Sequence, residues 1–342
     1  MDKKSKVRVL ISNTFDPYFN LATEDWIFQE MDPEINILYL WRNQETVVIG
    51  RFQNPWTECN LKKMEEDNVL LTRRQSGGGA VFHDLGNTNF TFLSSKENYS
   101  KELNNKIITE ALEDFDINAY ASGRNDILVD TKDGPRKISG SAFKEKKDRS
   151  FHHGTLLIEA NLSKLGDYLN PSKKKLQSKG ISSVKSRVEN LSNLNSSINH
   201  DDLCKSIISK FFKNYGQECE IETLDENVLK KIPELVKYYE FLKDWDWRFG
   251  ETPKFNHQLE ERFSWGGVEV FIDSHKAKIE NIKIYSDSLH PEMIELLMQK
   301  LNGQTYDSNG ISKAIEDTIS ELPMISEYLI EFKEWMINQI SL

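Results

Sequence analysis

The chain has 342 residues, of which 38% are hydrophobic and 29% charged, and its formal net charge is -10. This composition is that of an ordinary globular protein and excludes a disordered chain. The acidic balance gives no general attraction to nucleic acid or to an anionic membrane, so any recognition of phosphate has to come from local groups. The length predicts roughly two domains.

The cysteines and the N-terminal segment predict the compartment. Cys59, Cys204 and Cys219 show no Cys-x-x-Cys spacing and are odd in number, which argues against a disulfide framework and a structural zinc site. The segment MDKKSKVRVLIS carries basic residues but no sustained apolar run, and no stretch of about 20 apolar residues occurs. We therefore expect a cytoplasmic protein in a reducing compartment.

The first part of the chain is predicted to alternate helices and strands. Asp16 is a candidate N-cap and Pro17 suits the first helical position, so a helix should begin there and continue through LATEDWIFQEM. The elements expected after it are strands over 35–41 and 45–51, a helix over 57–68, the strand VLLTRR, and a helix over about 100–115.

The stretch from Arg73 to Asn87, RRQSGGGAVFHDLGN, combines paired cations, a glycine triplet and an apolar strand. Three consecutive glycines bury no side chain, so another group is expected to approach their backbone closely. The stretch matches neither the P-loop nor the dinucleotide-binding fingerprint. The turn at 84–87 and the alternating residues TNFTF predict that the glycines lie on a loop leading into a β-hairpin.

Successive backbone N–H groups in this loop are suited to an anion, and Arg73 or Arg74 can add charged hydrogen bonds to a phosphate. The alternative is a flexible approach to the hairpin with solvated arginines.

Four closely spaced strands are predicted next: INAYASG, NDILVD, RKISGSAF and FHHGTLLIEA. Their short connections favour antiparallel pairing, because parallel neighbours need crossovers of about a dozen residues or more. The first domain is therefore predicted to be α+β and not doubly wound.

The rest of the chain is predicted to complete this domain and to form a second one. A helix over 161–169 precedes a polar, Lys- and Ser-rich segment over 171–197, whose length suggests a functional loop. The elements expected after it are helices at about 200–215 and 225–243, the strands FSWGGVEVFID and KIENIKIYSD, and three helices. We place the domains at 1–247 and 256–342, with a linker over 248–255.

Lys137 is the main candidate catalytic residue, because it lies in the small-residue run KISGSA, where a long cation has no evident core role. Its ammonium suits a phosphate and a carboxyl oxygen on which charge develops together. The alternative is a solvent-facing strand lysine. Asn125 and Asp126 suit either a metal-bridged phosphate or an Asx turn. His83, His152 and His153 lack a closed metal-ligand spacing.

Basic residues are concentrated in 173–187, interrupted by Gly180 and serines. This segment either folds over a nucleotide or is a solvated surface. The basic residues of this segment are Lys173, Lys174, Lys175, Lys179, Lys185 and Arg187.

Taken in order, eight segments closely resemble the lipoate-protein ligase A family in its bacterial two-domain form. They run through the whole chain: DPYFNLATED, LWRNQETVVIGRFQNPWTECN, RRQSGGGAVFHDLGN, ASGRNDILV, RKISGSAF, FHHGTLL, LNPSKKKLQSKGISSVKSRV and ERFSWGGVE. The resemblance implies a catalytic domain of the biotin-ligase and class II synthetase-like fold, with a mixed, largely antiparallel sheet. It also implies a small C-terminal α+β domain that moves between steps.

The reaction implied by the resemblance is lipoate plus ATP giving lipoyl-adenylate and pyrophosphate, followed by transfer of the lipoyl group to a lysine. The mixed anhydride supplies the leaving group that a carboxylate lacks. The implied acceptors are lipoyl domains of 2-oxoacid dehydrogenase E2 subunits and the glycine-cleavage H protein. We expect a monomer, with no nucleic-acid or membrane partner, that uses ATP and Mg²⁺.

The resemblance also assigns roles to residues, with Lys137 as the catalytic residue touching both lipoate and phosphate. The ATP-binding residues would be Arg74, Gly79, Ala80, Val81, Phe82, Asn125, Asp126 and Lys137. The lipoate-binding residues would be Leu21, Trp41, Arg74, Ser76, Gly77, Gly78, His83, Lys137, His153 and Gly154. The loop over the adenylate would include Lys175, Lys179, Gly180, Lys185 and Arg187. No dedicated metal site is expected, since Mg²⁺ would arrive with ATP, with Asp126 as its candidate protein ligand.

Two alternatives stay open. An octanoyl or lipoyl transferase of the same fold would use a cysteine thioester, although no cysteine falls in the segments above. A lipoate or nucleotide sensor would keep the pocket without turnover, although Lys137 and the complete closing segment argue against it. A biotin ligase is disfavoured because RRQSGGGAVF stands where its GRGRxGR-type loop would be.

Overall fold

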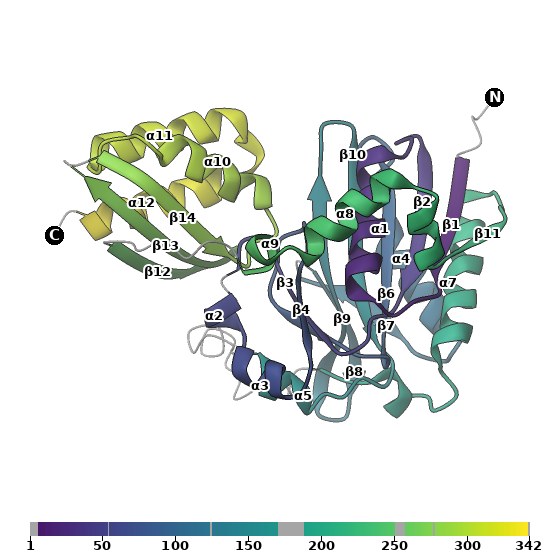
Figure 1. The fold of residues 1–342 in the computed structure, drawn as a ribbon. Coiled ribbons are helices and arrows are strands. Elements are labelled where there is room, and N and C mark those ends of the chain that lie inside the picture. The colour runs from purple at the N-terminus through teal and green to yellow at the C-terminus, as the bar shows by residue number, and fades with distance from the viewer. Residues whose placement is uncertain are drawn as a thin grey trace.

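An eight-stranded sheet forms the frame of the larger part of the molecule (Figure 1). The computed structural model describes residues 6–53, 55–123, 125–169, 188–249, 257–275 and 278–340. The strand order is β11-β1-β2-β6-β10-β9-β8-β7. The strands are β1 (Lys6–Ser12), β2 (Ile35–Trp41), β6 (Asn87–Ser95), β7 (Ala119–Ser122), β8 (Asp126–Thr131), β9 (Gly134–Glu145), β10 (Arg149–Leu157) and β11 (Ile221–Leu224).

The sheet is mixed, as predicted. β1 pairs in parallel with β2 and β11, whereas β2, β6, β10, β9, β8 and β7 pair antiparallel in that order. The predicted antiparallel meander is therefore confirmed for β7 to β10. β1 and β11, which the sequence analysis did not predict, add the parallel part.

Helices cover both faces of the sheet (Figure 1). On one face, α4 (Lys101–Glu113) and α7 (His200–Tyr215) pack against Val9 and Leu38. On the other face, α1 (Pro17–Glu30) and α8 (Pro233–Lys243) pack against the next residues along the same strands, Leu10 and Tyr39. Both faces are buried because successive strand residues point to opposite sides and are apolar here.

α1 begins as predicted, since the Asp16 side chain accepts a hydrogen bond from the Tyr18 N–H at 2.9 Å. The helix predicted over 225–243 is shorter in the structure. A 3-10 helix (η3, Glu226–Lys230) comes first, and α8 begins only at Pro233. Proline lacks the N–H that an uninterrupted helix requires and is favoured in the first turn.

A second sheet with the order β4-β3-β5 carries the glycine loop. Its strands are β3 (Thr46–Ile49), β4 (Leu70–Arg73) and β5 (Val81–His83), and the helices α3 (Leu61–Glu66) and α5 (Lys164–Tyr168) pack beside it. The short helix α2 (Pro55–Glu58) precedes α3 in the chain. The predicted hairpin is wrong, because β5 pairs with β3 while β6 belongs to the large sheet. The chain turns at Gly86, where a Cβ would lie 2.1 Å from the Glu159 carbonyl oxygen.

The C-terminal part has its own sheet and core. β12 (His257–Phe263), β13 (Gly266–His275) and β14 (Lys278–Ser286) pair antiparallel. α10 (Pro291–Leu301), α11 (Ser308–Glu321) and α12 (Ser326–Ile340) pack on this sheet (Figure 1). The predicted strand FSWGGVEVFID spans the end of β12, a turn and β13, and β12 begins earlier than predicted, at His257.

Three short helices complete the description: η2 (Leu191–Asn193), α9 (Trp245–Phe249) and η4 (Pro323–Ile325). The domain limits at 247 and 256 stay predictions, because residues 250–256 lie outside the described ranges. Among the helices of the described ranges, none is both long and apolar enough to cross a bilayer.

Candidate active site

A cavity of about 260 Å³ lies where the two sheets of the larger part meet the segment before α10. Most of the predicted site residues border it. They are Leu21, Trp41, Arg74, Gly78, Gly79, Ala80, Val81, Phe82, His83, Asn125, Asp126, Lys137, His153 and Gly154. The predicted closing residues from Lys175 to Arg187 lie outside the described residues.

Lys137 and Asp126 form an ion pair at the cavity wall, with 2.6 Å between Nζ and Oδ1. Lys137 lies on β9 and Asp126 begins β8, beside an irregularity in the pairing of these strands. A Cβ at Gly140 would lie 2.6 Å from Lys137 Nζ, so the absence of a side chain at Gly140 leaves room for the ammonium beside the strand. The pair can hold the cation beside a ligand, because both side chains remain partly exposed.

Arg74 is buried and its guanidinium shapes the glycine loop. It donates to the carbonyl oxygens of Gly77 at 2.7 Å, Gly79 at 2.8 Å and Val48 at 3.1 Å. Its Nε also donates to Ser76 Oγ at 3.0 Å. Burial lowers the pKa of Arg74 to about 10, so the side chain stays cationic near neutrality. Arg74 therefore supports the loop and adds positive potential to the cavity.

Arg73 has a different role from the phosphate contact predicted for one of the two arginines. Its guanidinium donates to carbonyl oxygens of Gln53, Arg51, Trp247 and Arg248 at 2.7 to 2.9 Å. It does not border the cavity. Arg73 instead joins α9 to the turn after β3, because a guanidinium can satisfy several carbonyls at once.

The close approach predicted from the glycine run is present, but at Gly77 and Gly78 the neighbouring group is protein backbone. A Cβ at Gly77 would lie 1.9 Å from the Ser288 carbonyl oxygen, and the Gly78 N–H donates to that oxygen at 2.8 Å. Gly78 also has a φ of +92°, which favours glycine. The loop thus contacts the segment that leads from β14 to α10. Neither Ser76 nor Gly77 borders the cavity.

A buried chain of hydrogen bonds begins at Ser76 in the glycine loop. Ser76 Oγ lies 2.8 Å from His153 Nε2, and His153 Nδ1 lies 2.9 Å from both carboxylate oxygens of Glu24. Thr91 Oγ1 donates to the same carboxylate at 2.6 Å. Because a carboxylate can only accept, Nδ1 is a donating nitrogen of this ring. This arrangement fixes the imidazole that borders the cavity.

Away from Lys137, around Trp41, the lining combines apolar side chains with the amides of Asn87 and Asn89. Leu21, Trp41 and Val48 are among the apolar residues, and Trp41 is held by a hydrogen bond from Nε1 to Thr91 Oγ1 at 3.1 Å. Trp41 lies on β2 and Lys137 on β9, three strands apart in the sheet order. At about 4.8 Å between neighbouring strands, this separation is roughly 14 Å. The cavity therefore has a charged end at Lys137 and a partly apolar end at Trp41.

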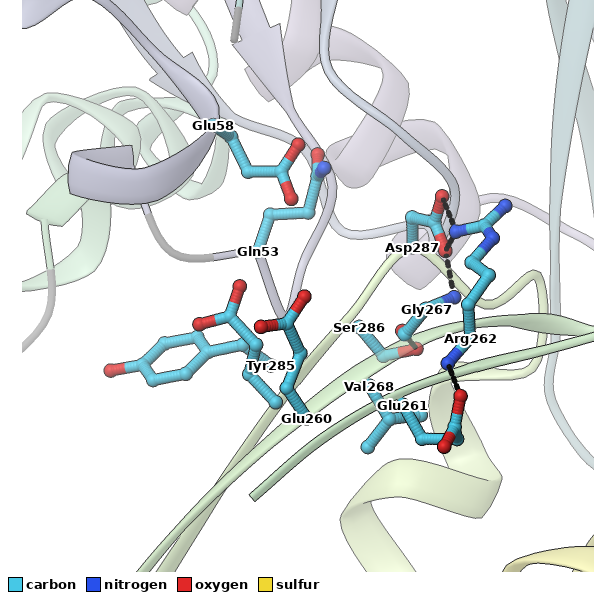
Figure 2. A pocket seen from close by; sticks show the side chains of 11 residues that line it. Gln53, Glu58, Glu260, Glu261, Arg262, Gly267, Val268, Tyr285, Ser286 and Asp287 are labelled. Carbon is cyan, nitrogen blue, oxygen red and sulfur yellow. Dashed lines mark hydrogen bonds and ion pairs between the residues drawn. The ribbon is translucent and has the colours of Figure 1, made fainter. Parts of the chain in front are cut away.

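Figure 2 shows a smaller hollow of about 40 Å³, which shares the lining residues Glu58, Arg262 and Asp287 with this cavity. Gln53 and Glu58 lie on one side of it, and residues of β12 to β14 lie on the other. The Arg262–Asp287 ion pair, at 2.8 Å, borders both hollows. The C-terminal part thus contributes side chains to the main cavity.

Among the described residues, no group of three or more His, Cys, Asp or Glu side chains is placed to hold a metal ion. Asn125 Nδ2 donates to the Ser141 carbonyl oxygen at 3.0 Å, so Oδ1 is the amide atom left to accept or to ligate. Asp126 and Asn125 therefore offer hard oxygen donors of the kind that suit Mg²⁺ on a polyphosphate.

The larger part thus holds one cavity with the Lys137–Asp126 ion pair on its wall and apolar side chains elsewhere in its lining, as sites for small anionic ligands do. The profile of the Lipoyl protein ligase A/B catalytic domain matches residues 16–212, and that of the Bacterial lipoate protein ligase C-terminus matches residues 252–336. The chain is 51% identical over 340 residues to lipoate-protein ligase A of Psychrobacter cryohalolentis, covering 98% of this chain and 99% of that protein. The chain belongs to the lipoate-protein ligase A family.

Solved structures agree with this assignment and with the predicted fold class. The crystal structure of P. falciparum LipL1 in complex with lipoate is 36% identical, with a TM-score of 0.84 over 97% of this chain and 99% of that one. A bi-partite lipoate protein ligase from Thermoplasma acidophilum is 24% identical and has a TM-score of 0.63 over 74% of this chain and 99% of that one. The latter likeness is one of fold. The protein is a lipoate-protein ligase.

Several residues of the site were missed from the sequence. Glu24 is buried in α1 together with its polar neighbours Thr23 and Asp25, and nothing in the local sequence distinguishes these side chains from exposed ones. Asn43 follows β2 and bonds to His83, but nothing in its local sequence indicates this contact. Arg262, Asp287 and Leu289 reach the cavity only through the packing of the C-terminal part.

Proposed function

We propose that the protein activates free lipoate with ATP, releasing pyrophosphate, and then transfers the lipoyl group from lipoyl-AMP to a lysine of an acceptor domain. The observation that carries this proposal is the Lys137–Asp126 pair at one end of a cavity whose other end is partly apolar. An aliphatic acid would place its carboxylate near the cation and its tail among Leu21 and Trp41. Each buried methylene would contribute about 0.8 kcal/mol.

In the first step a carboxylate oxygen bonds to the α-phosphorus of ATP, and the bond to the bridging oxygen breaks to release pyrophosphate. Negative charge increases on the phosphoryl oxygens while the two anions approach. Lys137 Nζ can donate to a carboxylate oxygen and to a phosphoryl oxygen, which lowers the cost of bringing them together. Holding both reactants in one cavity also removes the entropy cost of an encounter.

In the second step the amine nitrogen of the acceptor lysine attacks the acyl carbon, and AMP leaves with the electron pair of the anhydride bond. The amine loses its proton to solvent or to a base. The Arg74-supported loop Gly79 to Phe82 would contact the nucleotide, and His153, held by Glu24, would contact lipoate. Bound Mg²⁺ would neutralise phosphate charge, with Asp126 and Asn125 as its candidate ligands in the protein.

We propose lipoyl domains of 2-oxoacid dehydrogenase E2 subunits and the glycine-cleavage H protein as acceptors. The Thermoplasma acidophilum ligase is described together with its E2 lipoyl domain, which supports the first of these. We further propose a cytoplasmic monomer with no nucleic-acid or membrane partner. All three cysteines are free thiols, which fits a reducing compartment.

The rival transferase reaction needs a reactive cysteine. Cys59 and Cys204 are buried, and burial raises the pKa of each thiol to about 12. Cys219 is partly exposed, but its pKa is also raised. None of the three borders the cavity. The thiolate that a thioester mechanism requires is therefore disfavoured at each position.

The test is pyrophosphate release from lipoate, ATP and Mg²⁺, followed by mass spectrometry of an apo lipoyl domain. The proposal predicts pyrophosphate without acceptor and a lipoyl mass increase with it. Acyl transfer from a donor protein in the absence of ATP would instead establish the transferase. Ligand binding without either product would establish the sensor.

A further inference from the structure

Arg262 is a cation of the main cavity wall that comes from the C-terminal part of the chain. It lies near the end of β12 and borders both the main cavity and the smaller hollow. Its side chain is 16% exposed, and its Nη1 donates to both carboxylate oxygens of Asp287, at 2.9 and 2.8 Å. The ion pair therefore fixes one nitrogen of the guanidinium and leaves Nε and Nη2 for other partners.

These two nitrogens, Nε and Nη2, have no hydrogen-bond partner among the described residues. Neither belongs to the enclosed, unpartnered polar atoms of the described ranges, so both open onto free space. Figure 2 shows them on the side of the Arg262 guanidinium that is turned away from Asp287 and from the carboxylates of Glu58 and Glu260. Because a guanidinium only donates, these N–H groups are suited to an acceptor, and best to an anion.

The other cations of the main cavity have fewer donors to offer. All three guanidinium nitrogens of Arg74 donate to protein oxygens of the glycine loop and of β3. Lys137 Nζ pairs with Asp126 at 2.6 Å. Of the described lysines and arginines that border the cavity, Arg262 is therefore the one with two unpartnered nitrogens.

Arg262 is held beside the glycine loop by the segment that follows β14. Its partner Asp287 precedes Ser288, whose carbonyl oxygen accepts from the Gly78 N–H at 2.8 Å. Burial lowers the pKa of Arg74 to about 10, and the Asp287 carboxylate is near enough to oppose that shift. Since Gly78 precedes the segment proposed to contact the nucleotide, the guanidinium lies where a polyphosphate would extend from that segment.

We propose that Arg262 binds the β- and γ-phosphates of ATP and the departing pyrophosphate, with Nε and Nη2 donating to their oxygens. This inference rests on the proposed adenylation of lipoate. When the bond between the α-phosphorus and the bridging oxygen breaks, its electron pair stays on that oxygen and adds negative charge to pyrophosphate. A guanidinium beside this oxygen stabilises the charge, while Lys137 acts at the carboxylate and the α-phosphate. The C-terminal part thus supplies a catalytic residue for the first step.

The first test separates the two steps, because the second contains no pyrophosphate. Arg262→Gln removes the charge and keeps an amide that can donate to Asp287. The kcat/KM for ATP in pyrophosphate release should fall by about 10²-fold. Transfer of the lipoyl group from supplied lipoyl-AMP to an apo lipoyl domain should match that of wild type. An equal loss in both steps, or no loss in the first, overturns the inference.

Two further variants separate this contact from the ion pair. Arg262→Lys keeps a cation for Asp287 but has a single nitrogen, so it should unfold at the wild-type temperature and stay defective in pyrophosphate release. Full release by this variant would show that the ion pair is sufficient and would overturn the inference. Arg8→Gln is the matched control, because Arg8 also forms an ion pair through its guanidinium, with Glu222, and does not border the cavity. Its rates should equal those of wild type.

Inhibition by inorganic pyrophosphate and by AMP locates the contact on the nucleotide. Arg262→Gln should weaken inhibition by pyrophosphate about tenfold and leave inhibition by AMP unchanged, because AMP carries only the α-phosphate. Unchanged inhibition by pyrophosphate, or equal weakening for both, overturns the inference. A wild type that releases no pyrophosphate from lipoate and ATP would refute the proposed function. Calorimetric binding of ATP, which should be about tenfold weaker in Arg262→Gln, would then still test this contact.

Discussion

The Gly78 N–H donates a hydrogen bond of 2.8 Å to the Ser288 carbonyl oxygen, which joins the glycine loop to the C-terminal part through backbone atoms. The adjacent Gly77 has no room for a Cβ beside the same oxygen. The loop that borders the cavity and the small C-terminal unit are therefore in direct contact.

Gly77→Ala should weaken this contact. The new Cβ would lie 1.9 Å from a backbone oxygen, which cannot move as a flexible side chain can, so we expect a loss of about 1–3 kcal/mol in the free energy of unfolding. Hydrogen exchange at the Gly78 amide should also become faster. Gly166→Ala is the control, because its Cβ would meet nothing within 4 Å. Slow Gly78 exchange in Gly77→Ala would contradict the prediction.

Lys137→Ala should lower the rate of pyrophosphate release by about 10²–10³-fold, which is the usual effect of removing one charge-stabilising donor. The thermal unfolding temperature should change little, since the pair is partly exposed. Lys210→Ala is the matched control: Lys210 forms an ion pair with Asp114, also at 2.6 Å, on α7 away from the cavity. Equal rates for the two variants would remove Lys137 from the mechanism.

Chelation of Mg²⁺ should stop pyrophosphate release and leave lipoate binding intact. The proposed function places the ion on the ATP phosphates, beside the oxygen donors Asn125 and Asp126 of the cavity wall. Binding of lipoate by calorimetry, with and without chelator, separates the two effects. Loss of lipoate affinity on chelation would indicate a structural metal.

His152→Phe should change how stability depends on pH. His152 lies among the rings of Phe90, Phe92 and Phe143, no described residue bonds to either ring nitrogen, and burial lowers its pKa to about 3. The unfolded chain takes up a proton below about pH 6.5 and the folded chain does not, so acid destabilises the wild type. His152→Phe has no imidazole at this position to protonate, so it lacks this acid destabilisation.

Between pH 7 and pH 5, the free energy of unfolding of the wild type should therefore fall by about 2 kcal/mol more than that of His152→Phe. Urea unfolding at the two pH values measures it. His257→Phe, at an exposed histidine, serves as the control. A difference that stays constant between the two pH values would mean that His152 is not held neutral.

Local signals in the sequence were sufficient for the elements that depend on neighbours along the chain. Asp16 and Pro17 start α1 through a cap within the same segment, and the short turns between β7 and β10 leave antiparallel pairing as the economical arrangement. Lys137 was identifiable because a cation in a run of small residues is unusual. Its partner Asp126 lies on the adjacent strand.

Elements that depend on distant partners were not predictable in the same way. β1 is a strand because it is inserted between β2 and β11, whose residues lie about 30 and 210 positions further on. β5 and β6 adjoin in sequence but pair with different strands, so alternation alone suggested a hairpin that does not form. Arg73 bonds to carbonyl oxygens of α9, whereas Arg74 bonds within the glycine loop. This difference depends on the position of α9, which no local sequence pattern indicates.

Gly140 has no side chain where the ammonium of Lys137 lies, so each residue sets a condition on the other. Among related sequences the two positions should covary. Alanine at 140 would meet only Nζ and Cε, the flexible end of the lysine side chain, so the lysine could stay but its ammonium would shift away from Asp126. Related enzymes that keep the ion pair should therefore keep glycine at 140, and alanine should appear there only where the pair is lost.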